Sequence, residues 1–189
     1  MKRIVLLIAI SVVGTLIAGC GKQVATPPVT KQHVTQSPST NRVLLQGAAG
    51  YSGVANLKKW AQTANENPHS YIDQIQAGIA EFVNGHPHSA IRYYESAAAI
   101  SPQQGESYTD IGNVYRQTLR NNAKAIQYYR ESTARDPSYG FGWYDLAYVY
   151  SYLENNKSAA TNVYHQALKA LPSGDPYLKD IQQLISGMK

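Results

Sequence analysis

The sequence has a single cysteine, Cys20, so no disulfide can form within the chain. It also lacks the short motifs of common catalytic sites: there is no glycine-rich phosphate loop, no HExxH zinc motif and no GxSxG nucleophile turn. The only close pair of histidines, His86 and His88, has no third metal ligand nearby in the sequence. These absences predict a protein without metal or cofactor and argue against an enzyme, although an active site outside the known motifs stays open.

The excess of basic residues is confined to the start of the chain. Five of the 17 basic residues lie in the first 42 positions, where there is no acidic residue, and the other 12 face 12 acidic residues. These five are Lys2, Arg3, Lys22, Lys31 and Arg42. A nucleic-acid-binding domain usually gathers its basic residues on one face. Since the rest of the chain is formally neutral and shows no such cluster, nucleic acid is not an expected partner.

Residues 1–19 have the features of an export signal. Lys2 and Arg3 precede an apolar run that starts at Ile4. The run is shorter than the roughly 20 residues that a membrane-spanning helix needs. It ends in small residues, as signal peptides do at their cleavage site. The segment is therefore predicted to be a signal that is removed, and not a spanning helix.

The end of this signal, Leu16-Ile17-Ala18-Gly19-Cys20, resembles the bacterial lipobox. The resemblance implies that Cys20 is acylated, for example with palmitate, and becomes the first residue of a mature lipoprotein. An ordinary secretory signal followed by a chance cysteine is the alternative. A lipoprotein of this kind is exported and held in the periplasmic leaflet of the outer membrane, or on the outer face of the cytoplasmic membrane in a host with one membrane.

Residues 21–42 are rich in threonine, proline, glutamine and serine and contain no aromatic residue. A segment of this composition buries too little apolar surface to order itself. As a flexible coil it spans an r.m.s. distance of about 25 Å. We therefore expect a tether between the lipid and a folded region.

Two adjoining segments, 105–139 and 140–174, repeat one pattern with a period of 35 residues. Such a period is typical of helical repeat arrays. The matching pairs are Tyr108 and Trp143, Ile111 and Leu146, Gly112 and Ala147, Tyr115 and Tyr150, Ala125 and Ala160, Tyr129 and Tyr164, Ser132 and Ala167, and Pro137 and Pro172.

This pattern resembles the tetratricopeptide repeat (TPR) family, a helix–turn–helix unit of about 34 residues. The extra residue in each segment is expected to lengthen the turn between its two helices. The resemblance implies an all-α TPR solenoid with about three repeats, a partial N-terminal repeat and a C-terminal capping helix. The expected bounds are 1–19 for the signal, 20–42 for the lipidated cysteine and tether, 43–70 for the partial repeat, 71–104, 105–139 and 140–174 for the repeats, and 175–189 for the cap.

In TPR proteins, defined positions on the first helix of each repeat line a concave groove. Carried over to this chain, those positions hold Glu106, Thr109, Asn113, Arg116, Gln117, Phe141, Tyr144, Tyr148, Ser151 and Tyr152. Three of the tyrosines recur every four residues, on one helix face, and the repeat pattern does not require them. Packing of these tyrosines on the cap or on a neighbouring helix is the alternative to binding. The predicted peptide-binding face consists of Asn113, Arg116, Tyr144, Tyr148 and Tyr152.

Some TPR proteins hold the C-terminal carboxylate of a partner between lysine and asparagine side chains. Asn113 fits one of those positions, but Thr109 stands where the lysine would be. Asp145 stands at the place of the second asparagine, where its charge would repel a carboxylate. We therefore do not expect a carboxylate clamp.

Together these features predict a membrane-anchored TPR lipoprotein that acts as a protein–protein interaction scaffold or assembly adaptor in the bacterial cell envelope. Its partner would be a protein or peptide of the envelope. A structural protein that self-associates through the tyrosines is an alternative. An enzyme with an unrecognised site is less favoured, because Glu106 and Arg116 are the only charged residues among the groove positions.

Overall fold

A computed structural model describes residues 48–188 of the chain, and every regular element in this range is a helix. The predictions for the signal peptide, the acylated Cys20 and the tether lie outside the described residues. The all-α prediction is confirmed. The elements are η1 (Ala48–Gly50), α2 (Val54–Glu66), α3 (Tyr71–Val83), α4 (Pro87–Ile100), α5 (Gly105–Gln117), α6 (Asn122–Arg135), α7 (Gly140–Tyr148), η2 (Val149–Leu153), α8 (Lys157–Ala170) and α9 (Pro176–Ser186).

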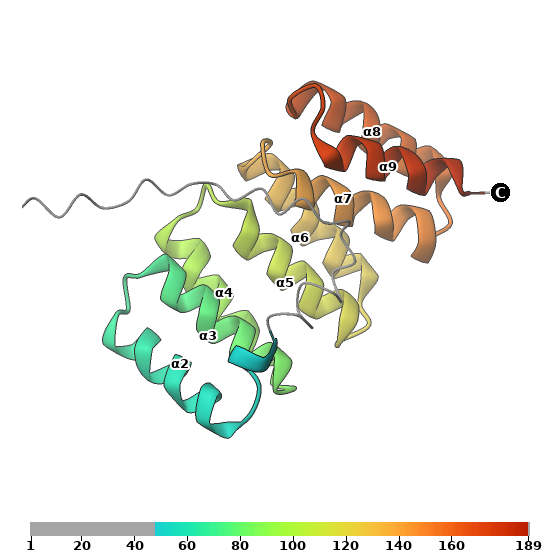
Figure 1. Cartoon of the computed structure of the whole chain (residues 1–189). Coiled ribbons are helices and arrows are strands. Elements are labelled where there is room, and N and C mark those ends of the chain that lie inside the picture. The colour runs from blue at the N-terminus through green and yellow to red at the C-terminus, as the bar shows by residue number, and fades with distance from the viewer. Residues whose placement is uncertain (1–47, 189) are drawn as a thin grey trace, which may run out of the picture. The chain divides into compact units, whose positions relative to one another are not determined.

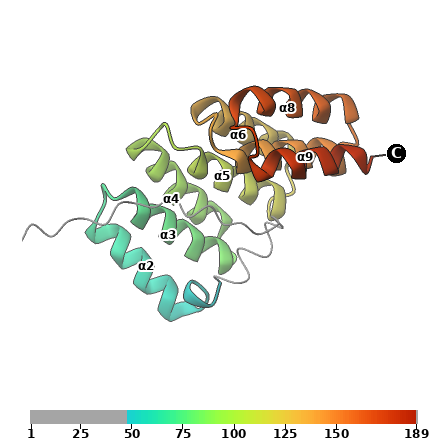
Figure 2. The ribbon, with the colours of Figure 1, turned by 45° about the horizontal axis from the view of Figure 1, so that its top comes forward.

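The helix pairs follow one another in space in the order of the sequence, from α2 at one end to α8 and α9 at the other (Figures 1 and 2). Successive helices form hairpins, in which α3 packs on α4, α5 on α6 and α7 on α8. At the N-terminal side α2 packs on α3 as the last helix of an incomplete repeat, and at the C-terminal side α9 covers α7 and α8. This arrangement is the predicted solenoid with a partial first repeat and a capping helix. None of the helices described is long and apolar enough to cross a bilayer.

Close approach within each hairpin depends on small residues opposite buried tyrosines. Gly112 of α5 faces Tyr129 of α6, and a Cβ atom at Gly112 would lie 2.5 Å from the tyrosine Cε1. Gly78 of α3 faces Tyr94 of α4 in the same way. Both rings are at most 2% exposed. The recurring small-and-aromatic pairs of the sequence are therefore contacts between the two helices of one repeat.

The first repeat folds although it lacks two aromatic residues of the pattern. Gln74 takes the place of the first aromatic residue and is only 5% exposed. Its Nε2 donates to the backbone oxygen of Ala64 on α2, at 3.1 Å. Glu81 stands at the second place, and its carboxylate is hydrogen-bonded to His86 Nδ1 at 2.8 Å. Buried polar groups are tolerated when they are hydrogen-bonded, so these replacements keep α3 in the array.

The extra residue of the 35-residue repeats is accommodated in two ways. Three residues, 84–86, separate α3 from α4, whereas four, 118–121, separate α5 from α6, which confirms the longer turn for 105–139. The prediction is wrong for 140–174, because only residues 154–156 separate η2 from α8. There the extra residue is absorbed by the π-helix η2, whose wider turn takes one residue more than an α-helical turn.

The turn between α5 and α6 holds Arg120 in the left-handed region, with φ at 52°. The matching position in the first repeat is Gly85, with φ at 82°. A residue with a side chain loses about 1–2 kcal/mol of stability in this region. Replacing it by glycine removes that cost, but the greater freedom of glycine in the unfolded chain cancels part of the gain. We expect Arg120→Gly to raise the free energy of unfolding by about 0.5–1 kcal/mol in urea titrations. Asn155→Gly, at the third matching turn with φ at 44°, is the control and should gain less, because asparagine tolerates this conformation.

The capping helix α9 closes the array through one apolar stripe. Leu178, Ile181 and Leu184 are at most 9% exposed and join the core of α6, α7 and α8. Asp175 caps the helix, since its Oδ1 accepts a 2.9 Å hydrogen bond from the backbone N–H of Tyr177. The cap thereby places Tyr177 beside the first turn of α7.

Candidate functional site

Four aromatic side chains form a continuous row along α7 and η2, which we call the aromatic strip: Phe141, Tyr144, Tyr148 and Tyr152. Neighbouring ring centroids are 6.4, 6.4 and 5.3 Å apart along the row. Tyr152 is 60% exposed, and the other three are partly exposed. Aromatic residues with exposed faces are favoured at protein interfaces. The structure therefore brings the three predicted tyrosines together with Phe141 on one face.

The capping helix covers one end of the strip. The ring of Tyr177 lies 5.9 Å from Phe141 and 6.1 Å from Tyr144. The alternative that the tyrosines pack on the cap therefore holds for this end. At the other end, Tyr148 contacts Tyr152 and the guanidinium of Arg116 on α5, whose Cζ lies 5.2 Å from the ring centroid. Tyr148 and Tyr152 thus form the end of the strip away from Tyr177, and Tyr152 is its most exposed member.

Arg116 and Asn113 belong to an internal network between α5, α6 and α7. Arg116 donates from Nε to Tyr129 Oη at 2.9 Å and from Nη2 to Asn113 Oδ1 at 3.0 Å. Tyr129 Oη donates to the same Asn113 oxygen at 2.9 Å. Arg116 Nη2 also lies 3.7 Å from Asp145 Oδ1. Asn113 is only 5% exposed, so it offers little surface to a partner. Its contribution is the hydrogen bond that holds Arg116 in position.

Three carboxylates lie on the same face as Arg116, and we call them the acidic centre: Glu106 and Asp110 of α5 and Asp145 of α7. On α5, Glu106, Asp110 and Asn113 follow one another at spacings of four and three residues, which places them on one helix face. Asp145 holds the position that matches Asp110, 35 residues later. Because Arg116 contacts both Asp145 and Tyr148, the acidic centre and the aromatic strip adjoin each other.

Burial governs the protonation of these acids. Asp145 is fully buried, and burial raises its pKa to about 7, against the opposing effects of Arg116 and Asn113. Burial also raises the pKa of Asp110, well above the usual range, and the charges of Glu106 and Asp145 add to the rise. Burial raises the pKa of Glu106 as well, although a 3.2 Å hydrogen bond from Tyr71 Oη to its Oε2 opposes the change. All three acids therefore keep their protons to a higher pH than exposed carboxyl groups do.

The sequence interpretation gave Asp110 no role and used Asp145 only to exclude a clamp. A signal was present, since an acid recurs at the same repeat position in 105–139 and 140–174. Whether the two acids meet depends on how α5 packs against α7, and the spacing of residues within one helix does not predict that packing. The binding role of Asn113, Arg116, Tyr144, Tyr148 and Tyr152 stays a prediction.

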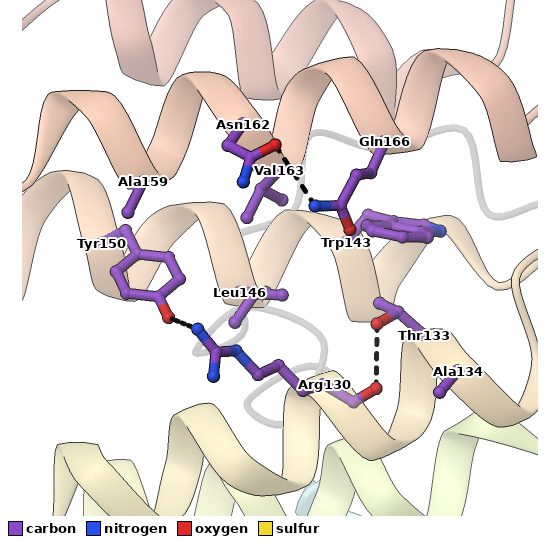
Figure 3. A pocket seen from close by; sticks show the side chains of 10 residues that line it. All are labelled: Arg130, Thr133, Ala134, Trp143, Leu146, Tyr150, Ala159, Asn162, Val163 and Gln166. Carbon is purple, nitrogen blue, oxygen red and sulfur yellow. Dashed lines mark hydrogen bonds between the residues drawn. The ribbon is translucent and has the colours of Figure 1, made fainter.

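A separate pocket of about 410 Å³ opens between α6, α7 and α8 (Figure 3). Its lining combines apolar side chains, such as Leu146 and Val163, with polar ones. Among the polar ones, Arg130 donates from Nη2 to Tyr150 Oη at 2.6 Å. The pocket gathers no acid, and among residues 48–188 no three histidine, cysteine, aspartate or glutamate side chains come together to hold a metal ion. It has the composition of a crevice between packed helices.

Comparison with known proteins agrees with this architecture. The family model described as tetratricopeptide repeat matches residues 105–139, so the chain contains a TPR unit at that place. A crystal structure of MamA is similar in fold, with a TM-score of 0.53 and 15% identity over 80% of this chain and 85% of that one. A second crystal structure of MamA protein gives a TM-score of 0.49 and 13% identity, over 77% and 85% of the two chains. No curated protein matches the sequence.

The chain is therefore an all-α protein with a TPR-like solenoid fold and one unit that the family model identifies. The fold suggests a scaffold for protein interactions.

Proposed function

We propose that this protein is a lipid-anchored adaptor of the bacterial cell envelope that binds a protein partner on the face formed by α5 and α7. The anchor would be the acylated Cys20, and residues 21–42 would carry the repeats away from the lipid. The aromatic strip would supply the contact area, with Tyr148 and Tyr152 at its open end. Arg116 would add a charged group beside Tyr148.

One observation carries the binding part of this proposal. The strip places four aromatic rings in a row on a helix whose core-facing side is already filled by Trp143, Leu146 and Tyr150. Phe141 and Tyr144 also contact Tyr177 of the cap, and Tyr144 and Tyr148 pack on the edge of the core, whereas Tyr152 is 60% exposed. Tyrosine is well suited to an interface, because it offers a large, rigid surface with few rotatable bonds.

Photo-crosslinking in the native host tests the proposal directly. A photoreactive residue at position 148, followed by mass spectrometry, should give one dominant adduct with another envelope protein. The matched control places the same residue at position 134, an exposed position on α6 outside the strip. Adducts between copies of this chain alone would favour self-association. Equal adducts at both positions, or none at 148, would contradict a binding role for the strip.

Replacing Tyr148 by alanine should weaken binding of the crosslinked partner by about tenfold to a hundredfold, as truncation of an interface tyrosine commonly does. The loss in unfolding free energy should stay below about 1.5 kcal/mol, because the ring is partly exposed and a neighbouring tyrosine lies on each side. Binding is measured by titration with the purified partner, and stability by urea unfolding.

Tyr164→Ala is the matched control for this variant. Tyr164 is also a partly exposed tyrosine, but it lies on α8, away from the strip. This control should lose stability and keep its affinity for the partner. A loss of stability in Tyr148→Ala as large as the 3–5 kcal/mol usual for a buried aromatic residue would make Tyr148 a core residue instead.

A further inference from the structure

The acidic centre carries more negative charge than the residues around it neutralise. Glu106, Asp110 and Asp145 lie on one face with Arg116 as the cation that faces them, at 3.7 Å from Asp145. The same guanidinium already donates hydrogen bonds to Tyr129 and Asn113. One positive charge is therefore shared among several acceptors, and the face keeps a net negative charge when the three acids are ionised.

Asp145 is the member whose partners are incomplete. It is 0% exposed, and neither of its carboxylate oxygens accepts a hydrogen bond of good geometry from the described residues, although Asn113 lies near enough to favour the ionised form. Buried polar groups in proteins are hydrogen-bonded in the large majority of cases, and a buried charge without donors is strongly unfavourable. A fully buried carboxylate in this condition indicates a site that is completed by something outside the chain.

Asp110 and Glu106 form the accessible side of the centre. Both are partly exposed. The side chain of Glu106 accepts one hydrogen bond, from Tyr71, and within residues 48–188 the side chain of Asp110 makes no hydrogen bond or ion pair. A group that enters between α5 and α7 can therefore touch these two carboxylates first, with the charge of Asp145 behind them.

Tyrosine side chains lie near the acidic centre and Arg116. Tyr71 of α3 donates to Glu106, Tyr148 of α7 packs against Arg116, and Tyr144 of α7 contacts Tyr177 of α9. Burial raises the pKa of Tyr177 to about 12, with a further contribution from the charge of Asp145, which is consistent with their proximity. The faces of tyrosine rings attract cations, and together with carboxylates they form a site for a positively charged group.

We propose that the acidic centre binds a lysine or arginine side chain of the protein partner, while the residues beside that basic residue pack on the aromatic strip. This inference rests on the proposed function and names the chemistry of its partner. The partner segment would carry one basic residue next to apolar or aromatic ones. A metal ion does not fit the site, because these acids do not form a metal-ligand group among the described residues. A partner carboxylate would meet the charge of Asp145.

Selection from a library of random linear peptides displayed on phage, with the full-length protein in mild detergent as bait, tests this proposal. The enriched peptides should contain lysine or arginine next to apolar residues far more often than the starting library. Their binding should weaken as the salt concentration rises, because salt screens the partly exposed acids. Enrichment of acidic peptides, or of peptides without basic residues, would overturn the proposal.

Two variants connect the selected peptides to the centre. Asp110→Asn and Glu106→Gln should each weaken peptide binding by at least about tenfold, since each removes a carboxylate that would contact the basic side chain. Glu95→Gln, an exposed acid on α4, makes the same change in net charge and should leave binding unchanged. Circular dichroism checks that the variants fold. Equal binding by Asp110→Asn, Glu106→Gln and the wild type would refute the assignment.

The selection also separates failure of this inference from failure of the proposed function. Peptides that need Tyr148 for binding but contain no basic residue would support the strip as a binding face and contradict the binding of a basic side chain at the acidic centre. If none of the enriched peptides depended on Tyr148, Asp110 or Glu106, both proposals would be wrong.

Discussion

Wild-type protein is expected to lose about 4 kcal/mol of stability between pH 4 and pH 8 through Asp145, and Asp145→Asn should abolish this loss. Burial raises the pKa of the Asp145 carboxyl from 3.8 to about 7. Each unit of difference between the folded and unfolded pKa corresponds to about 1.4 kcal/mol. The predicted effect is large because Asp145 is fully buried.

The direction follows from proton binding in the two states. Below about pH 4, Asp145 is protonated in both the folded and the unfolded chain. Between pH 4 and 7 the unfolded chain releases the proton while the folded chain keeps it, so a rise in pH favours unfolding. Above pH 7 both states are ionised and the loss is complete. Asp110 and Glu106 shift in the same direction, and Arg116 opposes the shift of Asp145.

The measurement is urea unfolding of both proteins at several values between pH 4 and pH 8. The informative quantity is the change in stability with pH, because any cost of the asparagine amide itself is independent of pH. Glu95→Gln serves as the control and should keep the wild-type pH dependence. Parallel curves for Asp145→Asn and the wild type would show that Asp145 is ionised in the folded state with adequate partners. A basic peptide bound at the centre should reduce the wild-type loss, since it stabilises the ionised form.

Replacing Cys20 by alanine should abolish fatty-acid labelling of the protein in a bacterial host. Each buried methylene group contributes about 0.8 kcal/mol, and stable anchoring needs more than one acyl chain. Cys20 is the single thiol of the chain, so its loss leaves no other cysteine for acylation. The variant should either leave the membrane fraction or persist as the longer precursor.

Growth with an alkyne-labelled fatty acid, followed by gel detection and mass spectrometry of the N-terminus, measures the effect. Wild type should carry the label and begin at Cys20. Tyr148→Ala is the control, since it keeps Cys20 and should be labelled fully. Label that persists in Cys20→Ala would exclude the lipoprotein assignment, and an unmodified wild-type N-terminus would favour an ordinary secretory signal.

Several features of the fold could be predicted because they depend on local spacing. Small and aromatic residues that recur with a period of 35 residues fix which helix faces meet, as the pairing of Gly112 with Tyr129 shows. The same reasoning placed Tyr144, Tyr148 and Tyr152 on one face of a helix. A helix brings residues four apart together whatever lies around it, so the row of rings follows from the sequence alone.

Other features were decided by contacts between helices. The burial of Asn113 depends on Tyr129 of α6 and Arg116 lying above it, and the contact of Phe141 with Tyr177 depends on where the cap rests. The extra residue of 140–174 lies in the π-helix η2, whose turn holds one residue more than an α-helical turn.

The acidic centre shows the difference most clearly. Spacing in the sequence places Asp110 beside Glu106 on one helix and gives Asp145 the same position in the next repeat. The packing of α7 against α5 then brought Asp145 to these two acids, buried it and left its oxygens without a hydrogen bond of good geometry from the described residues. Desolvation depends on every chain segment that covers a group, and those segments are distant in sequence, so neither composition nor periodicity could determine it.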